Sequence, residues 1–103
     1  MTEKFKNSVA EALADGNFEV ADKKKLNKIS QQEGIEEEIS SKYIAEEILK
    51  KNSKIKGYNL LSFGITANLT NQSSIVELII KIIDNLDKIK DFIEFFLDKV
   101  KKK

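Results

Sequence analysis

The sequence predicts a mainly α-helical protein, a small helical bundle with a long C-terminal heptad helix and a short β element near residues 60–70. Three observations support this prediction. Apolar residues recur at helical spacing over 1–52, a connecting segment over 53–73 is uncharged from Gly57 onward, and a heptad repeat fills 74–103. A chain of 103 residues can build one modest core, so we expect the three parts to form a single domain.

A first helix is predicted over residues 2–14. Phe5, Val9 and Leu13 recur at spacing four, as on one face of a helix, and Thr2 is a suitable N-cap. Gly16 ends this helix, because glycine readily adopts the left-handed backbone conformation that follows a helix.

Two further helices are predicted over 20–33 and 35–51. In the first of them Leu26 and Ile29 face the core, and Gly34 closes it. The second has acidic residues at its start and lysines at its end, which suits the helix macrodipole. Its expected buried stripe consists of Ile35, Ile39, Tyr43, Ile44 and Ile48.

The uncharged connecting segment predicts a half-buried strand near residues 60–70. Apolar and polar residues alternate there, and the apolar set is Leu61, Phe63, Ile65, Ala67 and Leu69. A strand needs a partner, which residues 55–60 or another chain could supply. The alternative is a short helix, since Leu61, Ile65 and Leu69 also lie at spacing four.

The last part of the chain predicts one long amphipathic helix over 74–103. Ser74 and Glu77 form a capping-box pattern at its start. Its apolar residues alternate between spacings of four and three, the a and d positions of a heptad. The predicted interface residues are these positions: Ile75, Ile79, Ile82, Leu86, Ile89, Ile93, Phe96 and Val100.

The apolar stripe of this helix is wider than a two-stranded coiled coil requires. Val76, Ile83 and Leu97 occupy e positions, and Leu78 and Phe92 occupy g positions. Such a stripe needs several neighbouring helices. The pattern fits both the central helix of a monomeric bundle and an oligomerisation helix, and the two alternatives stay open. In the second case the partner is another copy of the chain or a different helical protein.

The composition excludes several classes of function. The chain has no His, Cys or Arg, so it lacks the usual zinc ligands, the thiol nucleophile and the planar cation that clamps phosphate. With a net charge of only +1, nucleic-acid binding is not expected. We predict no catalytic residues, no cofactor and no enzymatic activity.

Membrane insertion is not predicted either. Charges interrupt every apolar run well before the roughly 18 residues that a spanning helix needs. No apolar region of the kind found in signal peptides follows the N-terminus, so we expect a cytoplasmic protein. Association of the last helix with a membrane surface is a further alternative, although its polar face mixes acids and bases.

The loop after the first helix has the composition of an ion-binding turn. Asp15, Gly16 and Asp22 resemble part of a calcium loop, but Leu13 occupies a position where a ligand is needed. Over about residues 5–50 the chain also resembles the tellurite-resistance TerB-like family. The matching residues are Ala14, Asp15, Gly16, Phe18, Asp22, Leu26, Ile29, Gly34 and Ile35, with Asp22 where the family usually has Glu.

That resemblance implies an all-helical domain that responds to divalent cations through Asp15 and Asp22. The alternative is that Asp15 and Gly16 only form a turn between two helices. From the residues themselves, the favoured function is a non-enzymatic protein-interaction module that self-assembles through its C-terminal heptad helix. The cation-responsive domain and the membrane-surface protein are the alternatives.

Overall fold

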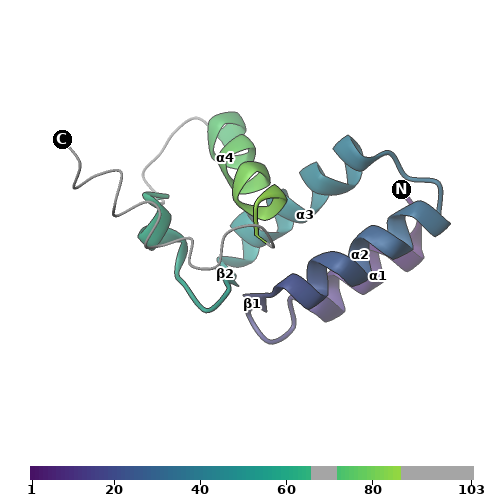
Figure 1. The fold of residues 1–103 in the computed structure, drawn as a ribbon, viewed down its shortest axis with the longest axis horizontal. Helices are drawn as coiled ribbons and strands as arrows, with labels where there is room; N and C mark the ends of the chain where they lie inside the picture. The colour runs from purple at the N-terminus through teal and green to yellow at the C-terminus, as the bar shows by residue number, and fades with distance from the viewer. Residues whose placement is uncertain (66–71, 87–103) are drawn as a thin grey trace.

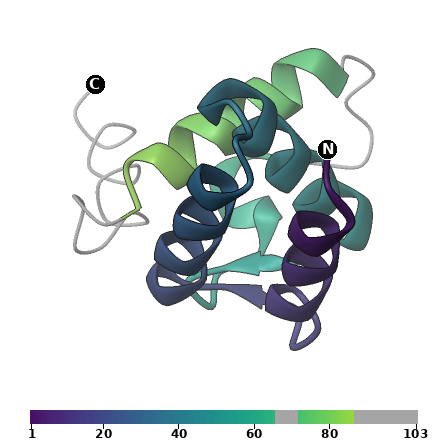
Figure 2. The same cartoon turned by 90° about the vertical axis from the view of Figure 1, so that its right-hand side faces the viewer.

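The computed structural model describes residues 1–65 and 72–86, and it confirms a mainly helical fold (Figure 1). Two helical pairs pack together and a pair of two-residue strands lies beside them (Figure 2). In chain order the elements are α1 (Glu3–Ala12), β1 (Asn17–Phe18), α2 (Val20–Gln32), α3 (Glu37–Lys51), β2 (Lys54–Ile55), the 3-10 turn η1 (Leu60–Phe63) and α4 (Gln72–Asp84).

The helices α1 and α2 lie side by side (Figures 1 and 2). At the start of α1 the Thr2 hydroxyl accepts a hydrogen bond from the Phe5 N–H at 3.3 Å, as expected for an N-cap. Phe5 and Val9 are fully buried on its inner face, so the predicted stripe is confirmed. At the start of α2 the Glu19 N–H donates to the Asp22 carboxylate at 2.9 Å, half of a capping box.

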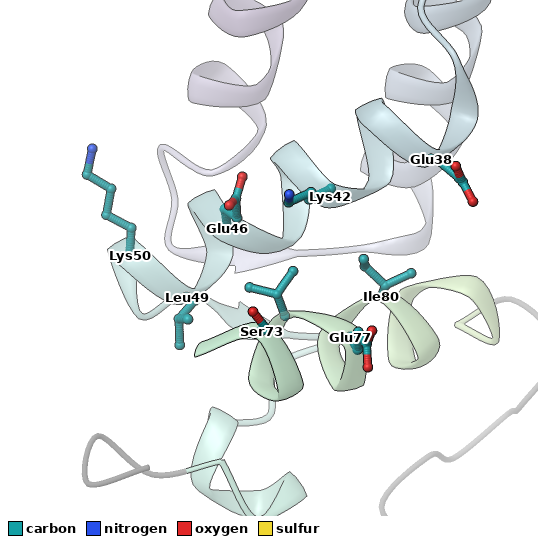
Figure 3. Close-up of a pocket in the computed structure, with 9 residues that line it drawn as sticks. Glu38, Lys42, Glu46, Leu49, Lys50, Ser73, Glu77 and Ile80 are labelled. Carbon is teal, nitrogen blue, oxygen red and sulfur yellow. The ribbon is translucent and has the colours of Figure 1, made fainter. Parts of the chain in front are cut away.

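The helices α3 and α4 pack against each other and run in opposite directions. The start of α3 lies near the end of α4, because Glu37 and Ile83 line one hollow. The end of α3 lies near the start of α4, where Leu49 and Ser73 line another (Figure 3). Acidic residues in the first turn of α3 and lysines in its last turn complement the macrodipole, as predicted.

The two short strands are parallel and join distant parts of the chain. Asn17 pairs with Lys54, and Phe18 pairs with Ile55. The Lys54 N–H donates to the Gly16 carbonyl at 2.8 Å, and the Lys56 N–H donates to the Phe18 carbonyl at 2.9 Å. These bonds attach the α1–α2 connection to the segment that follows α3.

The predicted β element near residues 60–70 is wrong for the part that the structure describes. Leu60–Phe63 forms a 3-10 turn, which Gly64 ends with a left-handed backbone (φ 79°). In such a turn residues three apart share a side, so Leu60 and Phe63 are both buried while Leu61 is 69% exposed. The alternation of apolar and polar residues suggested a strand, but no neighbouring strand lies beside this segment in the described residues. Residues 66–70 of the prediction lie outside the described residues.

The last described helix differs from the prediction at both ends. It begins at Gln72, so Ser74 lies in its first turn and is not the N-cap. It ends at Asp84, and a turn follows in which the Leu86 N–H donates to the Ile83 carbonyl at 3.1 Å. The remainder of the predicted long helix, 87–103, lies outside the described residues.

One core is formed from residues of every element. Its members are Phe5, Val9, Leu13, Phe18, Leu26, Ile44, Ala45, Ile48, Ile55, Leu60, Phe63, Ile65, Ile75, Val76, Ile79, Ile82, Ile83 and Leu86. Ile39, predicted to be buried, is instead 49% exposed. The buried residues of α3 are Ser40, Ile44, Ala45 and Ile48, and Ile39 lies on the opposite face of the helix. Within the described residues no helix is both long and apolar enough to cross a membrane.

Candidate functional site

A groove of about 810 Å³ runs between α3 and α4 (Figure 3). The residues that line it are Glu38, Lys42, Glu46, Leu49 and Lys50 from α3, and Ser73, Val76, Glu77 and Ile80 from α4. Leu49, Val76 and Ile80 supply its apolar part. The charged residues of both signs form its rim, so the groove suits an amphipathic protein surface better than a small charged metabolite.

The rim charges on α3 are exposed. In Figure 3 the Glu46 and Lys50 side chains point away from α4. Within residues 1–65 and 72–86, neither a hydrogen bond nor an ion pair joins the side chains of Glu38, Lys42, Glu46 and Lys50 to a partner. Elsewhere on α3, Lys51 Nζ lies 3.8 Å from a Glu47 carboxylate oxygen. The rim charges are therefore available to a partner.

The first half of the predicted heptad interface belongs to the core of the chain. Ile75, Ile79, Ile82 and Leu86 are at most 5% exposed. They lie on a different face of α4 from Ser73 and Glu77, which are exposed at the groove. The second half of the predicted interface, Ile89, Ile93, Phe96 and Val100, lies outside the described residues.

The predicted cation-binding residues have local structural contacts. Asp15 Oδ1 accepts a hydrogen bond from the Asn17 N–H at 3.0 Å, and Asp22 accepts one from Glu19. Each carboxylate thus satisfies a backbone donor in a turn or a helix cap. In the two described stretches of the chain, no group of three or more His, Cys, Asp or Glu residues could hold a metal ion. Cation binding at Asp15 and Asp22 stays a prediction.

Asn17 connects two loops, a role that the sequence did not reveal. Its Oδ1 accepts a hydrogen bond from the Gly57 N–H at 2.8 Å, and its Nδ2 donates to the Glu19 carboxylate. The composition Asp15-Gly16-Asn17 indicates a turn, but nothing in it identifies a partner 40 positions away. This side chain fixes the loop that contains Asp15 against the start of the uncharged segment.

A second, smaller hollow of about 320 Å³ lies where α2, α3 and α4 meet. Lys23 of α2 reaches the end of α4 there, and its Nζ donates to the Asp84 carbonyl at 3.3 Å. A lysine beside the last carbonyls of a helix compensates the negative end of the macrodipole. Lys23 therefore has a structural role in joining α2 to α4.

Among the described residues, Tyr43 is the titratable group whose pKa departs most clearly from its ordinary value. Its ring packs on Phe5, with ring centroids 6.1 Å apart and planes tilted by 55°. Burial raises the pKa of the Tyr43 hydroxyl above its ordinary value of 10.0, and the carboxylates of Glu47 and Glu3 raise it further. The hydroxyl is thus held in its neutral form at the contact between α1 and α3.

We expect this raised pKa to make the protein less stable in alkali. Above pH 10.0 the unfolded chain releases the Tyr43 proton while the folded chain retains it, so the free energy of unfolding falls as the pH rises. The substitution Tyr43→Phe should make that fall shallower. Urea unfolding of both proteins on either side of this pH measures the difference, and lysine titration affects both alike. Identical pH dependence in the two proteins would contradict the expectation.

The groove and the charges on its α3 rim are the features of the described residues that a partner could use, because they combine apolar surface with exposed charges. No family model, no curated protein and no solved structure matches this chain.

Proposed function

We propose that this chain is a non-enzymatic protein-interaction module that self-assembles through the part of its heptad stripe beyond Leu86. The contact residues in this proposal are Ile89, Ile93, Phe96 and Val100. We place this function in the cytoplasm as part of the same proposal. It is supported by the heptad spacing of these four residues in the sequence, because the preceding heptad residues Ile75, Ile79, Ile82 and Leu86 are buried in the core of the chain itself.

Up to Leu86 the stripe is already used inside the chain. Ile82 is fully buried and Leu86 is 1% exposed, so these residues have no surface left for a partner. The end of α4 also lies level with the start of α3, since Asp84 and Glu37 line the same hollow.

The sequence nevertheless continues with a dense apolar set after this point. It comprises Ile89, Phe92, Ile93, Phe95, Phe96, Leu97 and Val100. Apolar residues at heptad spacing need a neighbouring helix to cover them. The same stripe on another copy supplies a complementary one, because heptad residues pack against heptad residues.

We expect Ile93→Asp to reduce the assembly of the full chain without unfolding it. A charge at an a position opposes burial of the stripe in a partner, while the core residues up to Leu86 are unchanged. Light scattering should give a multiple of 11.7 kDa for the unmodified chain and a smaller mass for the variant. Circular dichroism should show that the variant keeps its helices.

Lys88→Asp is the matched control. It introduces the same side chain at a c position, on the opposite face of the predicted helix, and should leave the mass unchanged. An unmodified chain that stays at 11.7 kDa at high concentration would refute self-assembly. Binding to anionic vesicles by that monomer would favour the membrane-surface alternative, and calcium-dependent melting would favour the cation-responsive one.

A further inference from the structure

Four charged residues on α3 form a stripe with strictly alternating sign. They lie at spacing four along the helix: Glu38, Lys42, Glu46 and Lys50. At 3.6 residues per turn this spacing keeps them on one gently turning face. All four are exposed, and all four line the groove beside α4 (Figure 3).

The order of these charges is complementary to itself when reversed. A two-fold axis perpendicular to α3, passing between Lys42 and Glu46, places each residue opposite one of the other sign. Glu38 then faces Lys50 of the second copy, and Lys42 faces Glu46 of the second copy. A parallel arrangement in the same register would instead place like charges opposite each other, which is unfavourable.

We propose that this face of α3 is an isologous contact between two copies of the chain, with their α3 helices antiparallel. The inference rests on the proposed self-assembly and adds a contact surface separate from residues 87–103. A two-fold contact requires a surface that is complementary to itself, and the reversed charge order of α3 meets this requirement. A different protein partner would not require it.

The apolar residues of the same face obey the same symmetry. Ile39 is 49% exposed although it is a large apolar residue, and Leu49 is half-buried at the edge of the groove. The axis that pairs Lys42 with Glu46 also places Ile39 opposite Leu49 of the second copy. The contact therefore covers an exposed isoleucine near each of its ends, while the pairs of Lys42 with Glu46 lie closest to the axis.

The rim charges have no competing partners among residues 1–65 and 72–86. Neighbours at spacing four often pair along an exposed helix. Here the described residues contain no ion pair between members of the stripe, whereas Lys51 and Glu47 of the same helix do form one. The stripe is consequently free to pair across a contact.

A charge-exchange series on the full chain tests this inference. Lys42→Glu places two acids opposite each other at the contact, and Glu46→Lys places two lysines there. Each should weaken the α3 contact by about tenfold or more. The double variant Lys42→Glu/Glu46→Lys restores opposite charges in every pair and should restore the affinity. An equimolar mixture of the two single variants should associate with each other as well, since their charges are complementary.

Sedimentation equilibrium gives the affinities, and circular dichroism verifies that each variant is folded. Pairing within one helix predicts no recovery in the double variant, because that variant has two repulsive neighbour pairs on α3, as many as each single variant, where the unmodified chain has none. If the unmodified chain associates and all charge variants associate equally, the α3 contact is wrong and the proposal for residues 87–103 stands. If the single variants weaken association and neither the double variant nor the mixture recovers it, the antiparallel pairing is wrong. If the unmodified chain is monomeric throughout, both proposals fail.

Discussion

Replacing Ile82 with Asp is expected to unfold the chain at room temperature. Ile82 is fully buried on α4, at the contact with the other helices. The substitution removes the buried side chain and introduces a carboxyl group that has no partner there, which together cost about 5 kcal/mol or more. A domain of this size has a total stability of roughly 5–15 kcal/mol, so the loss is comparable to all of it.

Leu61→Asp is the matched control, since it makes a similar chemical change at a position that is 69% exposed. A surface substitution of this kind should change the free energy of unfolding by no more than about 0.5 kcal/mol. Circular dichroism at 222 nm during urea titration measures both variants. A cooperative transition of normal midpoint for Ile82→Asp would show that α4 is not part of the core.

The substitution Asn17→Ala is expected to destabilise the chain by about 1–3 kcal/mol. It removes the acceptor for the Gly57 N–H at 2.8 Å and the donor to the Glu19 carboxylate. The connection between the α1–α2 loop and the segment after β2 then depends on the strand pairing alone. Thermal unfolding should show a lower midpoint, with helix content below the transition unchanged.

Asn59→Ala provides the comparison for this loop effect. Asn59 is exposed at the start of η1, and its side chain makes no capping hydrogen bond. We expect its loss to be almost neutral. Equal destabilisation by the two substitutions would mean that any change in this region, and not the two hydrogen bonds of Asn17, determines the result.

The helical part of the fold was predictable because it depends on local patterns. The inner faces of α1 and α4 appear in the sequence as apolar residues at spacings of three and four, and these residues are buried. Helix ends were less predictable. Ser74 is a good cap by residue type, yet α4 begins two residues earlier, at Gln72.

The elements that depend on distant contacts were not predictable. β1 and β2 contain two residues each, too few for a periodic pattern, and their pairing joins segments on either side of two helices. The alternation around Leu61 suggested a strand, but a 3-10 turn formed where no partner strand was present in the described residues. The charge stripe of α3 is present in the sequence as four charged residues at spacing four. Its relation to the groove required the position of α4.

The parallel strand pair has a consequence for the order in which the chain folds. Helix pairs such as α1 with α2 bring together neighbours in the sequence and can form early, whereas the bond between Asn17 and Gly57 closes a loop of 40 positions. The amide protons of Lys54 and Lys56 donate into the α1–α2 loop, so they are protected only when both halves of the chain are in place. Their exchange with solvent deuterium should therefore report opening of the whole domain, while the amides at the start of α1 exchange through local fraying.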